Sequence, residues 1–263
     1  MIFLPLILAV TIFLPPIAMA AMVALIALGA AYEFLRAVGV GGNKRFCAYA
    51  VLSAAAIPFA VCLQAPAIVF FLILYLLTML LFLDAVITYK TARETWWSGL
   101  MAALFAGVVI PLFLSVLVLL KMRDYGHLYV LLVFITTMVS DSGAYFAGVF
   151  LGKHKGILKV SPNKSAEGCV GSLLSAVAGM MIYGFILVKC GFSVQFGYLL
   201  IYAVCGNFVT QLGDLAFSFV KRQNDIKDYG KLIPGHGGML DRFDSMIFVA
   251  PVIYMLVTVL PAF

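Results

Sequence analysis

Long apolar segments recur along almost the whole chain and constrain its fold more than any other feature. Each segment of roughly 17 to 25 residues can cross the hydrocarbon layer of a membrane, about 30 Å thick, as an α-helix. The segments are continuously apolar, whereas strands of a membrane β-barrel alternate in hydrophobicity over about 10 residues. Charged residues make up 11% of the chain, against about 25% in soluble domains. The sequence therefore predicts an all-α, polytopic integral membrane helical bundle.

Polar breaks between the apolar segments predict about nine transmembrane helices. We expect them at 2–14, 17–35, 46–63, 66–87, 95–120, 127–151, 169–188, 195–219 and 243–261. Pro15-Pro16 either joins two short helices or kinks one long helix, and the second case leaves eight spans. No soluble domain or repeat interrupts the pattern, so residues 1–263 are expected to form a single membrane domain.

The basic residues are distributed unevenly between the connections. Most of the 17 Lys and Arg residues lie in 36–45, 88–94, 152–168 and 220–242. The alternating connections contain only Lys121, Arg123 and Lys189. Because Lys and Arg concentrate in cytoplasmic loops, we expect the first set to face the cytoplasm from the inner membrane. This distribution accounts for the formal charge of +6 without a nucleic-acid partner.

The polarity of the segment 214–245 is exceptional for this chain. Asp214, Ser218 and Lys221 follow a 4-then-3 spacing, which places them on one face of a helix. Asp241 and Asp244 stand at i and i+3 at the start of the last predicted span. Asp214 lies inside an apolar segment, where an acid is costly and usually functional. The bases of the segment that could bind phosphates are Lys221, Arg222, Lys227 and Arg242.

A glycine-rich turn, Pro234-Gly-His-Gly-Gly238, completes this segment. Glycines allow positive φ and bring backbone N–H groups close to an anion. Carboxylates suit Mg²⁺ bound to substrate phosphates, whereas the usual Cys and His ligands of zinc are missing. Taken singly, the basic residues could simply follow the excess of Lys and Arg in cytoplasmic loops. Asp241 and Asp244 could simply be favourable negative charges at the N-terminus of a helix. Taken together, the groups predict phosphoryl or nucleotidyl transfer.

Ser218-x-Val-Lys-Arg-x4-Lys-Asp-x-Gly-x2-Ile-Pro-x-His-Gly-Gly-Met-x-Asp-Arg-Phe-Asp244 resembles the signature of the phosphatidate cytidylyltransferases, also called CDP-diacylglycerol synthases. Two upstream stretches, 140–148 and 161–168, resemble further blocks of that family. The second block departs from it: the family more often has a basic residue at Asn163, Thr at Ser165 and an aromatic residue at Ala166. The N-terminal half resembles the family only as apolar helices. We therefore expect the catalytic signature at 214–245 and a supporting region at 140–168.

The resemblance implies that CTP and phosphatidic acid react with Mg²⁺ to give CDP-diacylglycerol and pyrophosphate. It leaves room for a second, monovalent cation and for a homodimer. It implies three metal ligands, Asp214, Asp241 and Asp244, with Asp141 as an additional acid. It implies binding of CTP phosphates by Lys221, Arg222, Lys227, Arg242, Gly237 and Gly238, and of the lipid phosphate by Ser161, Asn163 and Lys164. His236 would contact phosphate, donate a proton or fix the loop.

Other functions and two other acids need an interpretation. A transporter would place acids near the membrane midplane on broken helices, a related enzyme would use CTP with an isoprenoid acceptor, and a scaffold would need no patterned polar segment.

We interpret Glu33 as an i, i+3 partner of Arg36. We interpret Asp84 as a helix-end acid that reaches the interface or pairs with Lys90.

Overall fold

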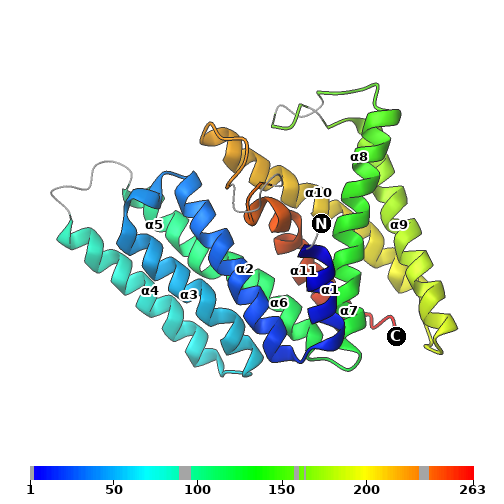
Figure 1. Cartoon of the computed structure of the whole chain (residues 1–263), viewed down its shortest axis with the longest axis horizontal. Helices are drawn as coiled ribbons and strands as arrows, with labels where there is room; N and C mark the ends of the chain where they lie inside the picture. The colour runs from blue at the N-terminus through cyan, green and yellow to red at the C-terminus, as the bar shows by residue number, and fades with distance from the viewer. Residues whose placement is uncertain (1–2, 89–95, 157–159, 163, 231–236) are drawn as a thin grey trace. The chain divides into compact units, whose positions relative to one another are not determined.

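The structure is a computed structural model that describes residues 3–88, 96–156, 160–162, 164–230 and 237–263. These residues are mainly helical, and none of them forms a β-strand. The α-helices are α1 (Phe3–Phe13), α2 (Pro16–Ala37), α3 (Lys44–Cys62), α4 (Ala67–Ile87), α5 (Trp96–Leu104), α6 (Ile110–Lys121), α7 (Gly126–Phe134), α8 (Ser140–Phe150), α9 (Ala166–Lys189), α10 (Phe196–Gln223) and α11 (Leu240–Val259) (Figure 1).

Two of the predicted spans contain a short π-helical segment. Phe105–Val109 joins α5 to α6, and Ile135–Val139 joins α7 to α8, without a break in helical geometry. Helix α5, the first π segment and α6 therefore form one continuous helix, and α7, the second π segment and α8 form another. A π segment widens one turn of the helix and is frequent at functional sites. The second segment ends two residues before Asp141.

Eight helices in the described part of the chain are long and apolar enough to cross a membrane. They confirm the prediction of a polytopic all-α membrane protein. α1 has 11 residues and spans about 16 Å, well short of the hydrocarbon layer. It is separate from α2, because Pro16 occupies the first turn of α2. Residues 2–14 were thus correctly predicted as a helix, but the described part of it is shorter than a span.

The contacts divide the chain into two compact units. The first comprises Met1–Asp124 and Val220–Phe243. The second comprises Tyr125–Phe219 and Asp244–Phe263. The single membrane domain expected from the sequence stays a prediction.

In the first unit, α2 packs against α3 and α6 through a face of small residues (Figure 1). Ala20, Ala27 and Ala31 on this face are completely buried. Small side chains let membrane helices approach closely, which strengthens their van der Waals contact. The hydroxyl group of Ser53 on α3 donates a hydrogen bond to the carbonyl oxygen of Gly107 in the first π segment, with an O···O distance of 2.9 Å.

The first unit also contains an ion pair between the buried Asp84 and the exposed Arg45. The side chain of Asp84 is 3% exposed, and one carboxylate oxygen lies 2.8 Å from a guanidinium nitrogen of Arg45. The other oxygen accepts a hydrogen bond from the side-chain amide of Asn43 at 3.2 Å. Asp84 therefore ties the end of α4 to the start of α3, and our interpretation of a surface-reaching acid was wrong. The partner we expected, Lys90, lies outside the described residues.

In the second unit, α8 and α9 lie side by side (Figure 1) because both expose small residues at their contact. A Cβ atom at Gly143 would collide with Ser175, and a Cβ atom at Gly171 would collide with Ala147. Hydrogen is therefore the only side chain that both positions accept at this spacing. The contact holds two elements of the candidate site, Asp141 on α8 and the first turn of α9, in a fixed relation.

Candidate active site

Polar residues occur at nearly every turn along one face of α10. They follow spacings of 4, 3, 4 and 3 residues, the repeat of a single helix face. They are Asn207, Gln211, Asp214, Ser218 and Lys221. The last three were predicted from the sequence to share one helix face, and all three lie within α10. The face begins one to two turns earlier than predicted.

Asn207 forms the centre of a buried hydrogen-bond network in the second unit. Its side-chain amide donates to Ser140 Oγ at 3.1 Å and to Ser172 Oγ at 2.6 Å. Its oxygen accepts from Gln211 Nε2 at 2.8 Å. Buried polar groups that satisfy one another specify a single arrangement of the helices that carry them. The network thereby joins α8, α9 and α10 immediately beside Asp141.

Lys164 and two carboxylates form a charged cluster above this network. Lys164 Nζ lies 2.5 Å from Asp214 Oδ2, and the side chains are 27% and 32% exposed. Asp141, exposed in the first turn of α8, interacts electrostatically with both groups. Two carboxylates around one ammonium group leave an excess of negative charge. Oxygen ligands with such an excess fit a hard divalent cation such as Mg²⁺.

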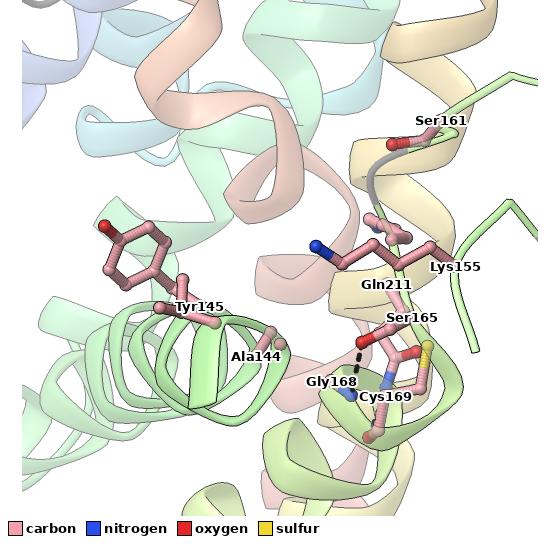
Figure 2. Close-up of a pocket in the computed structure, with 11 residues that line it drawn as sticks. Ala144, Tyr145, Lys155, Ser161, Ser165, Gly168, Cys169 and Gln211 are labelled. Carbon is pink, nitrogen blue, oxygen red and sulfur yellow. Dashed lines mark hydrogen bonds between the residues drawn. The ribbon is translucent and has the colours of Figure 1, made fainter. Parts of the chain in front are cut away.

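A pocket of about 360 Å³ opens beside Lys164 in the same unit (Figure 2). Its polar wall comes from the connection before α9 and from α10, with Lys155, Ser161, Lys164, Ser165 and Gln211. Its apolar wall includes Ala144, Tyr145 and Val149 of α8. In Figure 2 the side chain of Lys155 extends across the pocket toward the side where Tyr145 lies. The pocket is thus cationic on one side and apolar on the other, as the binding site of an anionic amphiphile would be.

The connection that forms the polar wall is folded back onto the start of α9. Ser165 caps this helix, because its hydroxyl oxygen accepts a hydrogen bond from Gly168 N at 3.1 Å (Figure 2). In the first turn of the same helix, a carboxylate oxygen of Glu167 lies 2.6 Å from His154 Nδ1. Ser and Thr both cap helices, so either residue type suits this position.

Of the lipid-phosphate ligands that we predicted, Ser161 and Lys164 both line the pocket. Asn163 lies outside the described residues. Lys155, which the sequence analysis did not select, lines the same pocket and adds a second ammonium group. Lys155 could have been selected from the sequence because it lies in a connection rich in Lys residues.

Asp241, in the first unit, is the centre of a second cluster. Its Oδ1 lies 3.0 Å from Lys221 Nζ, and its Oδ2 accepts from Tyr229 N at 2.8 Å and Gly238 N at 3.1 Å. The side chains of Asp241 and Lys221 are only 8% and 13% exposed. Charge-assisted bonds of this kind are the stronger hydrogen bonds of proteins. Asp241 therefore holds Lys221 at the end of α10 together with Tyr229 and Gly238 of the following connection.

The other basic residues of the first unit are more exposed. Lys227 lines a pocket of about 470 Å³ together with Arg36 and Tyr229. Arg222 and Arg242 are exposed, and Arg222 donates to the carbonyl oxygen of Ile226 at 3.4 Å. These residues have the charge for phosphate binding, and the structure keeps them accessible.

The glycine turn is described only in part. Gly237 has a φ of +82°, a left-handed conformation of the kind that the glycines of this turn allow. Gly238 is buried and follows it directly. Residues 231–236, with Pro234 and His236, lie outside the described residues. The predicted contact of His236 with phosphate stays a prediction.

The predicted metal set is distributed over both units. Asp244, in the second unit, is 8% exposed, and its Oδ1 accepts from Ser245 N at 2.7 Å. No group of three or more His, Cys, Asp and Glu in the described part of the chain could hold a metal ion. Metal ligation by Asp214, Asp241 and Asp244 together stays a prediction. The pair Asp141 and Asp214 has the donor chemistry for a divalent cation within one unit.

Glu33 has a different partner from the one predicted. Its side chain is 4% exposed, and its Oε2 accepts a hydrogen bond from Leu240 N at 2.8 Å. No described ion pair joins it to Arg36, so our interpretation of an i, i+3 pair was wrong. Like Asp214, Glu33 is an acid inside an apolar segment, where an acid is costly and usually functional.

Comparison with known proteins gives a consistent picture. Residues 1–260 match the sequence model described as "Cytidylyltransferase family". The phosphatidate cytidylyltransferase of Bacillus subtilis is 37% identical over 156 residues, which are 59% of this chain and 56% of the relative. That of Staphylococcus saprophyticus is 34% identical over 170 residues, 65% of this chain and 64% of the relative. That of Mycobacterium tuberculosis is 39% identical over 164 residues, 62% of this chain and 49% of the relative. The matched part thus spans about half to two thirds of these relatives.

Proposed function

Because the chain belongs to the cytidylyltransferase family, we propose that it transfers the cytidylyl group of CTP to phosphatidic acid. The products are CDP-diacylglycerol and pyrophosphate. The observation that carries this proposal is the pocket of the second unit, where Lys155, Ser161 and Lys164 face an apolar wall. The curated relatives that are named phosphatidate cytidylyltransferases support the choice of substrates.

The reaction joins two polyanions and needs charge neutralisation more than proton transfer. A phosphate oxygen of the lipid attacks the α-phosphorus of CTP, and the bond from that phosphorus to the bridging oxygen breaks. Pyrophosphate leaves with the electron pair of that bond. The attacking phosphate is already an anion near neutral pH, so no strong general base is required. Positioned cations supply the main stabilisation of the transition state.

The pocket of the second unit is our proposed site for the lipid phosphate. The ammonium groups of Lys155 and Lys164 and the hydroxyl group of Ser161 can donate hydrogen bonds to it. Lys164 is held at its place by Asp214, so its ammonium group is oriented before the lipid binds. The adjoining surface of α8 exposes Tyr145, Phe146 and Phe150, which suits acyl chains.

Asp141 and Asp214 are our proposed ligands for Mg²⁺ in this unit. When bound, the ion would neutralise phosphate charge. In the first unit we propose that Lys221, Arg222, Lys227 and Arg242 bind the phosphates of CTP. We further propose that these groups face the cytoplasm, where the predicted excess of Lys and Arg lies.

The test uses the purified full-length chain in detergent with labelled CTP and Mg²⁺. One reaction contains phosphatidic acid and a second contains a polyprenyl phosphate. We expect a labelled CDP-lipid only with phosphatidic acid. Absence of that product, or preference for the polyprenyl acceptor, contradicts the proposed substrate.

Variants test the site in the same assay. Asp214→Asn and Asp241→Asn are expected to lower kcat/KM by about 100-fold, because loss of one such electrostatic group lowers rates by about 10²–10³. Asp225→Asn is the matched control: Asp225 is exposed and has a φ of +53°, which Asn tolerates. Full activity of Asp214→Asn would remove Asp214 from the proposed Mg²⁺ site. Full activity of Asp241→Asn would show that the reaction does not need Asp241 to hold Lys221.

A further inference from the structure

Glu33 on α2 is buried against the segment that leads into α11, although nothing in the signature includes it. We propose that Glu33 is a positioning residue, whose carboxylate fixes Gly230, Gly238 and the start of α11 and thereby holds Asp241 in place. The catalytic part of this proposal rests on the proposed function. The structural part does not depend on it.

The contact of Glu33 with α11 is direct. Its Oε2 accepts a hydrogen bond from the backbone N–H of Leu240, the first residue of the helix, at 2.8 Å. The first N–H groups of a helix have no partner within the helix, and negative charge is favourable at this end. A side chain from α2 thus satisfies the start of a helix that lies 207 residues later in the sequence.

Two glycines accommodate the carboxylate on either side. A Cβ atom at Gly230 would lie 2.6 Å from Glu33 Cδ, and one at Gly238 would lie 2.7 Å from the same atom. Real Cβ atoms essentially never come this close to another heavy atom. Glu33 therefore lies against the backbone at both positions, and any larger side chain there would displace it.

Gly238 connects Glu33 to Asp241. Its backbone N–H donates to Asp241 Oδ2 at 3.1 Å, while its Cα faces the carboxylate of Glu33. Asp241 in turn binds Lys221 Nζ at 3.0 Å. Gly238 is thus held between two carboxylates, and a displacement of Glu33 would move the residue that orients Asp241.

A neighbouring contact strengthens this connection. Phe34, the residue after Glu33, stacks on the ring of Tyr229 with centroids 6.3 Å apart. The backbone N–H of Tyr229 donates to Asp241 Oδ2 at 2.8 Å. Two consecutive residues of α2 therefore contact Tyr229 and Gly238, the two residues in the described part of the chain whose backbone N–H groups bind this oxygen of Asp241.

One carboxylate oxygen of Glu33 is buried without a bond. Oε1 has no hydrogen-bond partner among the residues that the structure describes. A glutamine could accept the same bond from Leu240, so that bond alone does not require an acid at this position. Ionisable groups inside a membrane protein are costly and usually functional. This supports a role in setting the position of Asp241 beyond helix capping alone.

The experiment compares Glu33→Ala, Glu33→Gln, Gly238→Ala and the double variant Glu33→Ala/Gly238→Ala in the full chain. We expect Glu33→Ala and Gly238→Ala to lower kcat at least about tenfold, because displacement of a reacting group by about 1 Å can lower a rate about 100-fold. KM for phosphatidic acid should change less than twofold, since its proposed pocket is lined by other residues. Glu33→Gln should lie between wild type and Glu33→Ala.

The double variant tests the contact itself. With alanine at position 33, a methyl group at position 238 no longer meets the carboxylate. The double variant should therefore be no slower than Gly238→Ala alone, whereas independent effects would multiply. A multiplied loss contradicts the proposed contact. Leu25→Ala, an exposed residue on the same helix, serves as the control and should keep wild-type kcat.

Amide hydrogen exchange gives a second measurement that does not need the reaction. Glu33→Ala should speed exchange in a peptide covering 237–245 and leave a peptide from α9 unchanged. Wild-type exchange together with wild-type kcat in Glu33→Ala would overturn the proposal. If the wild-type protein makes no CDP-lipid, the proposed function fails, and the exchange result still decides whether Glu33 fixes the start of α11.

Discussion

The ammonium group of Lys164 lies 2.5 Å from a carboxylate oxygen of Asp214, which joins the connection before α9 to the middle of α10. Asp141 interacts electrostatically with both groups. Lys164 also lines the pocket of the second unit. The same ammonium group therefore serves two neighbours: it partly neutralises a pair of acids, and it presents positive charge to whatever anion enters the pocket.

The position of Lys164 predicts a specific effect on lipid binding. Lys164→Ala should raise the apparent KM for phosphatidic acid roughly 10- to 100-fold, because hydrogen bonds to charged groups contribute about 1.5–3 kcal/mol. KM for CTP should rise less. Lys164→Arg should recover part of the loss by keeping the charge. Steady-state kinetics with each substrate varied in turn measure both constants.

The control for this prediction is Lys189→Ala, which removes an exposed lysine at the opposite end of α9. It should leave both constants unchanged. An unaltered lipid KM in Lys164→Ala would exclude Lys164 from the proposed phosphate site.

The two acids beside Lys164 lead to a prediction about cation binding. Asp141→Asn and Asp214→Asn should each raise the Mg²⁺ concentration for half-maximal activity, because each removes one negative oxygen ligand. Lys164→Ala should lower that concentration, because it removes the competing positive charge. Opposite shifts from neighbouring substitutions would separate a cation site from a purely structural ion pair.

Electron paramagnetic resonance of Mn²⁺ bound to the detergent-solubilised protein measures the cation affinity of each variant without turnover. We expect affinity to rank Lys164→Ala above wild type, and wild type above the two Asn variants. Equal Mn²⁺ affinity in all four proteins would show that Asp141 and Asp214 do not bind the cation.

The helices could be predicted from the sequence because apolar length is set by the membrane. The predicted spans 66–87 and 127–151, for example, differ by at most one residue at each end from α4 and from Gly126–Phe150. The prediction did not include the π segments, because a continuously apolar stretch has no periodicity that would reveal a widened turn. It also treated 2–14 as a span, although its described part is α1, with 11 residues.

The residues of the candidate site could be predicted from the sequence only in part, for a different reason. Asp214 stood out because a charge in an apolar segment is conspicuous, whereas the neutral amides of Asn207 and Gln211 on the same helix face were not. Glu33 was conspicuous, but its partner Leu240 is separated from it by 207 positions, and no local pattern connects them. Contacts of this length arise from packing, so the sequence suggested a nearby partner, Arg36, that the structure does not support.

The close contact of α8 and α9 predicts that Gly171 accepts no side chain. A methyl group at this position would collide with Ala147 and lie 3.1 Å from the carbonyl oxygen of Gly143. Gly171→Ala should therefore destabilise the protein by about 1–3 kcal/mol, the usual cost of overpacking. Because α8 contributes Tyr145 to the pocket and α9 contributes Gly168, KM for phosphatidic acid should rise as well.

Gly197→Ala is the matched control, because Gly197 lies in α10 with no heavy atom within 4 Å of an added Cβ. Alanine is favoured over glycine in a helix, and Gly197 lies in the first turn of α10, so this variant should be at least as stable as the wild type. Thermal unfolding in detergent compares the two substitutions. The double variant Gly171→Ala/Ala147→Gly moves the methyl group to the other helix and should recover most of the lost stability and lipid KM. If Gly171→Ala unfolds at the wild-type temperature, or if Ala147→Gly gives no recovery, the spacing of α8 and α9 is not what limits this position.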